Sequence, residues 1–313
     1  MEPEAQRDPS PAVGRLSAEF VLAFLKRVSR ISGGDFLDGV IRLAILDANI
    51  RHLIASPEVA KAYASFETPI PDEMRRPASI NAVAGSLGLP FETVRRRVHA
   101  LDRQGLAQAG KDGVILSQNQ LITGPVQQVL DENFASLAAF YGRLRTMAPA
   151  LELVPAPAAG EQTAAKPADE PVRVAMRSTV GYVLRYLESA QPVAGDFLNA
   201  IMFLAIVVAN VGHITNDQTA SDRFSTPQTV APDSERRRLT VHALSKDLGM
   251  SFETTRRRVN ALMERGVCLR DGSGIYVPAA TLLSDPVVKH RRTNAASLQR
   301  LFGGLQRLGV RFD

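Results

Sequence analysis

Two stretches of the sequence decide the fold: LGLPFETVRRRVHALDRQGLA at residues 87–107 and LGMSFETTRRRVNALMERGVC at residues 248–268. Each carries a glycine, Gly88 or Gly249, at which one helix ends and the chain reverses, because glycine takes a positive φ without steric cost. A second helix begins three residues later in both stretches. The pattern predicts two short helices joined by a tight turn, followed by a hairpin.

Both stretches belong to an internal repeat that covers most of the chain at an offset of 161 residues, without a gap. Working outward, GDFL at 34 recurs at 195, and LAI at 43 recurs at 204. Such self-similarity indicates two copies of one structural unit. The segment LELVPAPAAGEQTAAKPADEPV between the copies is rich in alanine and proline and has no apolar periodicity, which is typical of a linker.

The repeat predicts the domain organisation. We expect a disordered N-terminal tail at 1–14, a first domain at 15–148, an Ala/Pro-rich linker at 149–172 and a second domain at 173–313. In each copy, apolar spacing predicts a short helix (about 17–32 and 178–189) and a long apolar helix (36–54 and 197–214). Two short helices with a hairpin and a closing helix follow, so the predicted fold class is mainly α with small β-hairpin wings (α+β).

The helix after each glycine turn has two different faces. On a wheel of about 100° per residue, Phe91, Val94, Val98 and Leu101 form the stripe that we expect in the core. The rest of the circumference carries the arginine triplet. Arginine suits bidentate contacts with guanine edges and phosphate oxygens, and threonine can meet a thymine methyl group, so this helix suits the major groove of DNA.

Further basic residues surround each of these helices. Lys111 and Arg270 lie at or near the hairpin tips, where they can reach a phosphate or the minor groove. A basic group precedes each motif as a candidate phosphate clamp: Arg75-Arg76 in the first copy and Arg236-Arg237-Arg238 in the second. The predicted DNA-binding residues are Thr93, Arg95, Arg96, Arg97, His99, Lys111, Thr254, Arg256, Arg257, Arg258, Arg270, Arg75, Arg76, Arg236 and Arg237. For Arg97 and Arg258, on a shoulder of the wheel, the alternative is an ion pair with acids of their own domain.

The two stretches at 87–107 and 248–268 resemble the recognition segment of bacterial winged helix-turn-helix regulators of the GntR, MarR and IclR kind, over about 40 residues per copy. The resemblance implies two tandem winged-helix domains that form a pseudo-dimer and bind an operator. Matched by position, it places DNA contacts at Thr93, Arg95 and Arg96 and at their equivalents Thr254, Arg256 and Arg257. Phe91 and Phe252 depart from those families, which often carry a polar contact residue after the turn.

Composition and the remaining polar residues exclude several classes of protein. A net charge of +5 over 313 residues decides little by itself. The single cysteine, Cys268, reads as a core residue and excludes an intramolecular disulfide. Asn49 with His52, repeated as Asn210 with His213, offers too few ligands for a metal site, and we expect the pairs to fix helix packing between the halves. Catalytic motifs are absent, so we predict no enzyme, no metal and no cofactor.

The N-terminus lacks the basic start and apolar run of a signal peptide, and the apolar segment at 197–214 has a charged counterpart in the first copy. We therefore expect both long helices in protein cores and the chain in the cytoplasm, associated with the nucleoid. A tandem arrangement also predicts that the copies read adjacent major grooves of one site. The segment Lys289–Arg292, where the first copy has Gln128–Asp131, predicts that the second copy binds DNA more strongly.

The sequence therefore predicts a double-stranded DNA-binding transcriptional regulator. Two alternatives stay open: a plasmid-type replication initiator, which would bind several direct repeats near an origin, and a winged-helix interaction scaffold of a chromosome segregation complex. Self-association and a small-molecule effector are left open as well.

Overall fold

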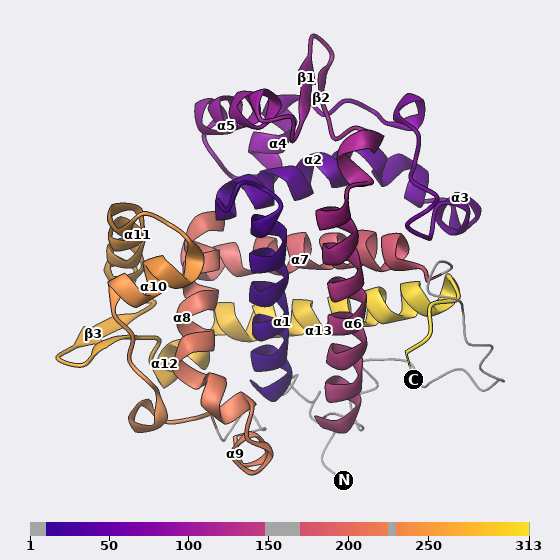
Figure 1. The fold of residues 1–313 in the computed structure, drawn as a ribbon. Coiled ribbons are helices and arrows are strands. Elements are labelled where there is room, and N and C mark those ends of the chain that lie inside the picture. Colours follow the sequence, from indigo (N-terminus) through magenta and orange to yellow (C-terminus); the bar gives the residue numbers. More distant parts are fainter. Residues whose placement is uncertain (1–10, 148–169, 225–229, 313) are drawn as a thin grey trace. The chain divides into compact units, whose positions relative to one another are not determined.

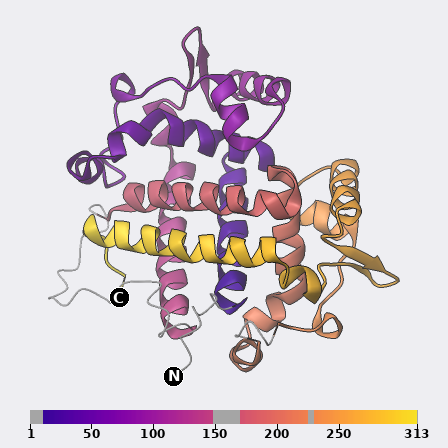
Figure 2. The ribbon, with the colours of Figure 1, turned by 180° about the vertical axis from the view of Figure 1, so that it is seen from behind.

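The computed structural model of the chain describes residues 11–147, 170–224 and 230–312 and is mainly helical, with two small antiparallel hairpins (Figures 1 and 2). The elements of the first copy are α1 (Pro11–Arg30), α2 (Phe36–Ile54), α3 (Pro57–Ala62), η1 (Asp72–Met74), α4 (Ile80–Leu87), α5 (Phe91–Arg103), β1 (Gln108–Gly110), β2 (Gly113–Ile115), η2 (Gln118–Leu121) and α6 (Gly124–Met147). Those of the second copy are α7 (Val172–Ala194), α8 (Phe197–Thr215), α9 (Gln218–Arg223), η6 (Asp233–Glu235), α10 (Val241–Leu248), α11 (Phe252–Glu264), β3 (Leu269–Asp271), β4 (Gly274–Tyr276), α12 (Ala279–Leu282) and α13 (Asp285–Arg307).

The first helix of each copy is longer than the sequence predicts. Helix α1 begins at Pro11, inside the segment predicted to be a tail, because Ala12 and Val13 already bury their side chains. Helix α7 likewise begins at Val172, at the end of the predicted linker, and continues to Ala194. The rest of the predicted tail (1–10) and most of the predicted linker (148–169) lie outside the described residues.

The contacts within the chain divide it into two compact units that do not follow the repeat boundary. The first-repeat unit contains residues 24–139, 155–184 and 301–313. The second-repeat unit contains residues 185–300, 1–23 and 140–154. Each unit therefore combines the helices and hairpin of one copy with the N-terminal half of the first helix of the other copy.

In the first-repeat unit, the core forms around α2, whose residues Val40, Ile41 and Ile45 are at most 1% exposed. The N-terminal half of α7 is held there by arginines. Arg177 donates hydrogen bonds to the carbonyls of Tyr63 (2.8 Å) and Ala60 (3.0 Å), and so ties α7 to the end of α3.

In the second-repeat unit, α8 occupies the position that α2 has in the first. Arg15 of α1 donates to the carbonyls of Phe224 (2.7 Å) and Ser221 (3.2 Å) at the end of α9. Helix α8 is long and apolar enough to cross a membrane by composition, but 72% of that stretch is buried within the protein. Cys268 is also fully buried, as the sequence predicts.

Candidate nucleic-acid interface

The tight turn between the two short helices forms as predicted in both copies. Ser79 Oγ accepts a hydrogen bond from the Ala82 amide (3.1 Å) and caps α4, and Gly88 ends that helix in the left-handed region at φ 60°. In the second copy Thr240 caps α10, and Gly249 ends it at the same φ of 60°. Only glycine adopts this conformation without strain, so the glycine fixes where α5 and α11 begin.

One face of α5 is anchored in the core. Val94, Val98 and Leu101 are fully buried, as are Thr255, Val259 and Leu262 at the equivalent positions of α11. Phe91, predicted to complete this stripe, is instead 47% exposed, and its equivalent Phe252 is 50% exposed. The predicted burial of Phe91 is therefore wrong, and the cause is local. Each phenylalanine is the first residue of its helix, where no preceding turn covers the ring.

The third arginine of each triplet faces its own unit and not solvent. Arg97 Nη1 lies 2.7 Å from Asp38 Oδ1 and 2.9 Å from Asp35 Oδ2, and its side chain is 26% exposed. Arg258 Nη1 lies 2.6 Å from Asp196 Oδ2. These are the pairs that the sequence left as an alternative for the shoulder arginines. Because Asp35 and Asp196 also cap α2 and α8, each pair joins the arginine helix to the start of the long helix.

The other two arginines of each triplet are exposed. Arg95 donates two hydrogen bonds to Glu92 (2.9 and 2.7 Å), and Arg256 makes the same pair with Glu253. These hydrogen bonds lower the pKa of the two glutamates, which stay ionised beside the arginines. Among the described residues, Arg96 and Arg257 take part in no ion pair, so their guanidinium groups face solvent with free donors.

The remaining predicted contact residues of these helices lie close to the same surface. His99 is exposed, whereas Thr93 and Thr254 are half-buried. Thr254 Oγ1 accepts a hydrogen bond from Ser251 Oγ (2.8 Å) at the start of α11. The face therefore combines two exposed arginines, one of them unpaired, with a small polar group near the helix start, and this arrangement recurs in both copies.

A hairpin follows each arginine helix, and both project outward beside their helices (Figure 1). Gly113 adopts φ 131°, and a Cβ atom there would lie 2.6 Å from the carbonyl oxygen of Ala78. Gly274 adopts φ 135°, with the same close approach to Leu239. In both copies the residue before the capped helix bridges the second strand, Ala78 to Val114 and Leu239 to Ile275, and only glycine leaves room for that bridge.

Asn49 joins α2 to this hairpin. Its Nδ2 donates to the carbonyls of Arg76 (2.8 Å) and Val114 (3.0 Å), and its Oδ1 accepts from the Leu116 amide (3.0 Å). Asn210 makes the equivalent bonds in the second copy. The asparagines do fix packing, but within one copy and not between the halves as predicted, because the nearest unpaired main-chain groups belong to their own hairpin.

The histidines next to these asparagines form no metal site. His52 Nε2 lies 3.2 Å from the carbonyl oxygen of Met74. His213 Nδ1 is buried without a hydrogen-bond partner. Throughout the described ranges, no group of three or more His, Cys, Asp or Glu side chains is arranged to hold a metal ion.

Four of the flanking basic residues are exposed: Lys111 and Arg270 on the hairpins, and Arg76 and Arg237 ahead of the capped helices. Arg75 and Arg236, the first residues of the predicted clamps, are buried. The side chains of Arg75 and Arg236 are 2% and 0% exposed, so neither can reach a phosphate at the surface. Each folds inward because its Nη2 donates to a buried main-chain carbonyl, that of Ile70 or Ala231.

The basic segment of the closing helix is also partly internal. His290 and Arg291 are each 6% exposed, which leaves Lys289 and Arg292 at the surface. The prediction that the second copy binds DNA more strongly rests on all four residues of this segment. Two of them are buried, so half of that support is lost.

Sequence reasoning missed the exposure of Phe91 and Phe252, although their place as the first helical residue was a usable signal. It also missed the role of Arg238, which lies 4.0 Å above the ring centroid of Tyr276 and 3.0 Å from Asp271 Oδ2. Pro77 stands at the equivalent position of the first copy, so this brace of the hairpin is specific to the second copy.

Comparison of the chain with protein-family models, with curated proteins and with solved structures gave no match.

Proposed function

We propose that the chain binds double-stranded DNA and regulates transcription, with α5 and α11 as the helices that enter major grooves and the hairpins as wings. The proposal interprets each copy as a winged helix-turn-helix domain and the chain as a pseudo-dimer of two such domains. Double-stranded DNA is the proposed partner, and the cytoplasm is the proposed location.

The observation that carries this proposal is the pair of exposed arginines on each anchored helix. Arg96 and Arg257 are exposed, and Arg95 and Arg256 are occupied only by a glutamate of their own helix. Such exposed pairs contribute little to stability because solvent screens them, so a phosphate or a guanine edge can replace the glutamate at small cost. Burial of the opposite face holds each helix rigidly, which favours reading of base edges.

The exposed phenylalanines support the same proposal. Phe91 and Phe252 lie at the start of each helix, next to the threonines, where an apolar ring can contact a thymine methyl group. A protein-interaction scaffold would also use exposed aromatic rings, but it has no need of two exposed arginines beside each ring.

The test is a titration of the full chain on genomic fragments and on a site selected from random DNA, at several salt concentrations. Replacing both Arg96 and Arg257 with alanine should weaken binding by about 1–3 kcal/mol for each arginine that reads a base, and relax the site at that position. An arginine that contacts phosphate should instead lower the slope of log affinity against log salt by about 1.

The matched control is Arg51→Ala, which removes an exposed arginine from α2, paired with Asp47 on the same helix. It should leave both affinity and salt slope unchanged. If the double variant binds DNA as tightly as the wild type, or if wild-type binding does not depend on salt, the proposal fails.

A further inference from the structure

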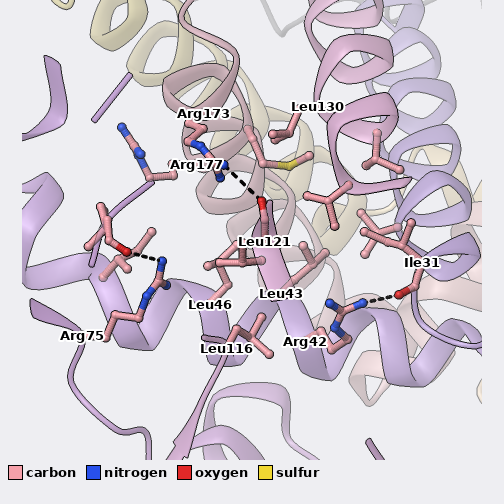
Figure 3. A pocket seen from close by; sticks show the side chains of 16 residues that line it. Ile31, Arg42, Leu43, Leu46, Arg75, Leu116, Leu121, Leu130, Arg173 and Arg177 are labelled. Atoms are coloured by element: carbon pink, nitrogen blue, oxygen red, sulfur yellow. Dashed lines mark hydrogen bonds between the residues drawn. The ribbon is translucent and has the colours of Figure 1, made fainter. Parts of the chain in front are cut away.

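A pocket in the first-repeat unit lies between α2, α6 and the N-terminal half of α7 (Figure 3). It encloses about 690 Å³ of space, part of it open to solvent. Its walls are mostly aliphatic and include Leu43, Leu46, Leu116, Leu121 and Leu130. A concave, largely apolar pocket with few polar groups is the usual form of a small-molecule site.

The polar groups of this pocket are arginines. Arg75, Arg173 and Arg177 gather on one side of it, while Arg42 lies on the other, beside Ile31 (Figure 3). All four are at least nine-tenths buried, with Arg75 at 7%, Arg173 at 8% and Arg177 at 9% exposed. We name the three gathered residues, Arg75, Arg173 and Arg177, the arginine cluster.

The arginine cluster is bonded mainly to neutral main-chain carbonyls. Arg173 donates to Phe66 (2.9 Å) and Leu121 (3.1 Å), and Arg177 donates to the end of α3. Arg75 Nη2 donates to Ile70 (2.9 Å), but its buried Nη1 has no hydrogen-bond partner. The cluster therefore holds an unused donor atom that solvent does not reach.

Few negative charges face the arginine cluster. Asp72 Oδ1 lies 3.3 Å from Arg75 Nε, and the Asp72 side chain is 37% exposed. Glu67 attracts Arg173 less strongly than Arg75 repels it. Burial, followed by repulsion among the guanidinium groups, lowers the pKa of Arg173 and Arg177 to about 10. Buried charges without full compensation are costly, so this side of the pocket favours an additional anion.

We propose that this pocket binds an amphipathic carboxylate, with its carboxylate between Arg75 and Arg173 and its aliphatic body against Leu43, Leu46 and Leu116. The planar carboxylate matches the fork of donors on a guanidinium group, and the unpaired Nη1 of Arg75 supplies one of those donors. The aliphatic walls favour the hydrocarbon part because its binding removes apolar surface from water.

The repeat provides a comparison within the same chain. The second-repeat unit has its own pocket, in which Arg236 stands in the place of Arg75 and also has an unpaired Nη1. Arg15 and Arg291 also line that pocket, and Arg15 bonds the end of α9 as Arg177 bonds the end of α3. However, the position equivalent to Arg173 is Ala12, so the arginine against which we place the carboxylate has no counterpart there, and we assign the carboxylate to the first-repeat unit alone.

The test is calorimetric titration of the full chain, without DNA, with sodium octanoate, and with sodium acetate, 1-octanol and octyl phosphate in parallel. Octanoate should bind at one site per chain. Acetate lacks the apolar body and octanol lacks the charge, so each should bind at least tenfold more weakly. Octyl phosphate should bind no more tightly than octanoate. Because no DNA is present, the result does not depend on the proposed function.

Two sets of variants locate the site. Arg75→Met and Arg173→Met should each weaken octanoate binding at least tenfold, whereas Arg236→Met should not change it. Leu46→Phe narrows the pocket without removing a charge and should also weaken binding, with Val207→Phe as the equivalent control in the other unit. Folding of each variant is checked by circular dichroism.

Absence of octanoate binding to the wild type overturns the proposal. So does binding that survives Arg75→Met, Arg173→Met and Leu46→Phe, or that is lost in Arg236→Met. Binding of octyl phosphate tenfold tighter than that of octanoate would also overturn the proposal, because the preferred ligand would then be a phosphate monoester and not a carboxylate.

Discussion

At the residue scale, the three consecutive arginines of each repeat have three different surroundings. Neighbouring residues on a helix point about 100° apart. Arg95 therefore pairs along the helix with Glu92, Arg96 faces solvent, and Arg97 reaches the acids at the start of α2. A triplet that looks uniform in the sequence thus divides into residues available for a ligand and one that supports the fold.

Arg97→Met should lower the free energy of unfolding by about 1–3 kcal/mol, because it leaves the partly buried Asp38 without its partner. Burial already raises the pKa of Asp38, and the hydrogen bond from Arg97 opposes that rise. Without Arg97 the pKa rises further, so the loss of stability should be largest near neutral pH and should shrink as acid protonates Asp38.

Urea denaturation between pH 4 and pH 7 measures this effect. The control is Arg95→Met, which breaks an exposed pair within one helix and should change the free energy of unfolding much less than Arg97→Met does. Equal losses in the two variants, independent of pH, would contradict the supporting role of Arg97.

His290 should make stability depend on pH. Burial, together with the nearby Arg291, lowers its pKa from 6.5 to about 4. Between pH 6.5 and 4 the unfolded chain therefore takes up a proton that the folded chain does not. The free energy of unfolding should fall as pH decreases through this range, by on the order of 3 kcal/mol at most.

This dependence should be reduced in His290→Asn, which removes the titrating group and retains a donor for Ser189 Oγ, 2.8 Å from the imidazole Nδ1. Replacement of the exposed His242 by asparagine is the control and should leave the pH profile unchanged. A parallel profile for wild type and His290→Asn would rule out this explanation.

At the element scale, the hairpin and the helix pair of each copy form one connected structure. Asn49 bonds both the second strand and the segment ahead of α4, and Ala78 bridges Val114. The hairpin has only three residues per strand, which is too short to be stable alone. Its position beside α5 therefore depends on these contacts and on the glycine that permits them.

Gly113→Ala should destabilise the first-repeat unit by about 1–3 kcal/mol, because the new Cβ would lie 2.6 Å from the Ala78 carbonyl oxygen at a φ that alanine rarely adopts. Gly274→Ala should do the same in the second copy. Amide hydrogen exchange should then become faster at Val114 or Ile275, whose amides bond across the bridge.

The control is Gly272→Ala at the tip of the second hairpin, where a Cβ meets nothing within 4 Å. It should leave exchange at Ile275 unchanged. Unaltered exchange in both Gly113→Ala and Gly274→Ala would show that the bridge does not hold the hairpin.

At the scale of the whole molecule, the two units are interleaved along the chain. The division between them falls within α1, α6, α7 and α13, so each unit needs residues from both copies. In the second-repeat unit, Arg15 from the first copy bonds the end of α9, and in the first-repeat unit, Arg177 from the second copy bonds the end of α3.

Arg15 and Arg177 can each be replaced with the residue at the equivalent position of the other repeat. Each substitution should affect the copy to which the arginine is bonded and not the copy that carries it. Arg15→Met should increase hydrogen exchange in α9 and Arg177→Leu should increase it in α3, each leaving the other helix unchanged. The physical reason is that buried carbonyls lose charged donors, at about 1–3 kcal/mol per site. Mass spectrometry of the exchanging full-length chain checks this, and an increase confined to the copy that carries the substitution would contradict it.

Local features could be predicted from the sequence because they depend on neighbours within a few residues. The helix ends at Gly88 and Gly249 and the hairpins after α5 and α11 form as expected, and the short side chains of Asp35 and Asp196 cap the long helices. A positive φ and a short capping side chain are properties of one or two residues, so their effect is the same wherever the segment lies. The exposed arginines of the candidate site followed from helical periodicity for the same reason.

What only the tertiary structure decided is which charged side chains find partners that are distant in sequence. Arg97 reaches Asp38 at the start of α2, and Arg177 reaches the carbonyl of Ala60. Arg75 and Arg236 look like surface cations in the sequence but are buried. The sequence determined a duplicated helical protein with an arginine-rich helix in each copy. Its folding determined which arginines are free and which are buried, because burial depends on the three-dimensional neighbours that compensate each charge.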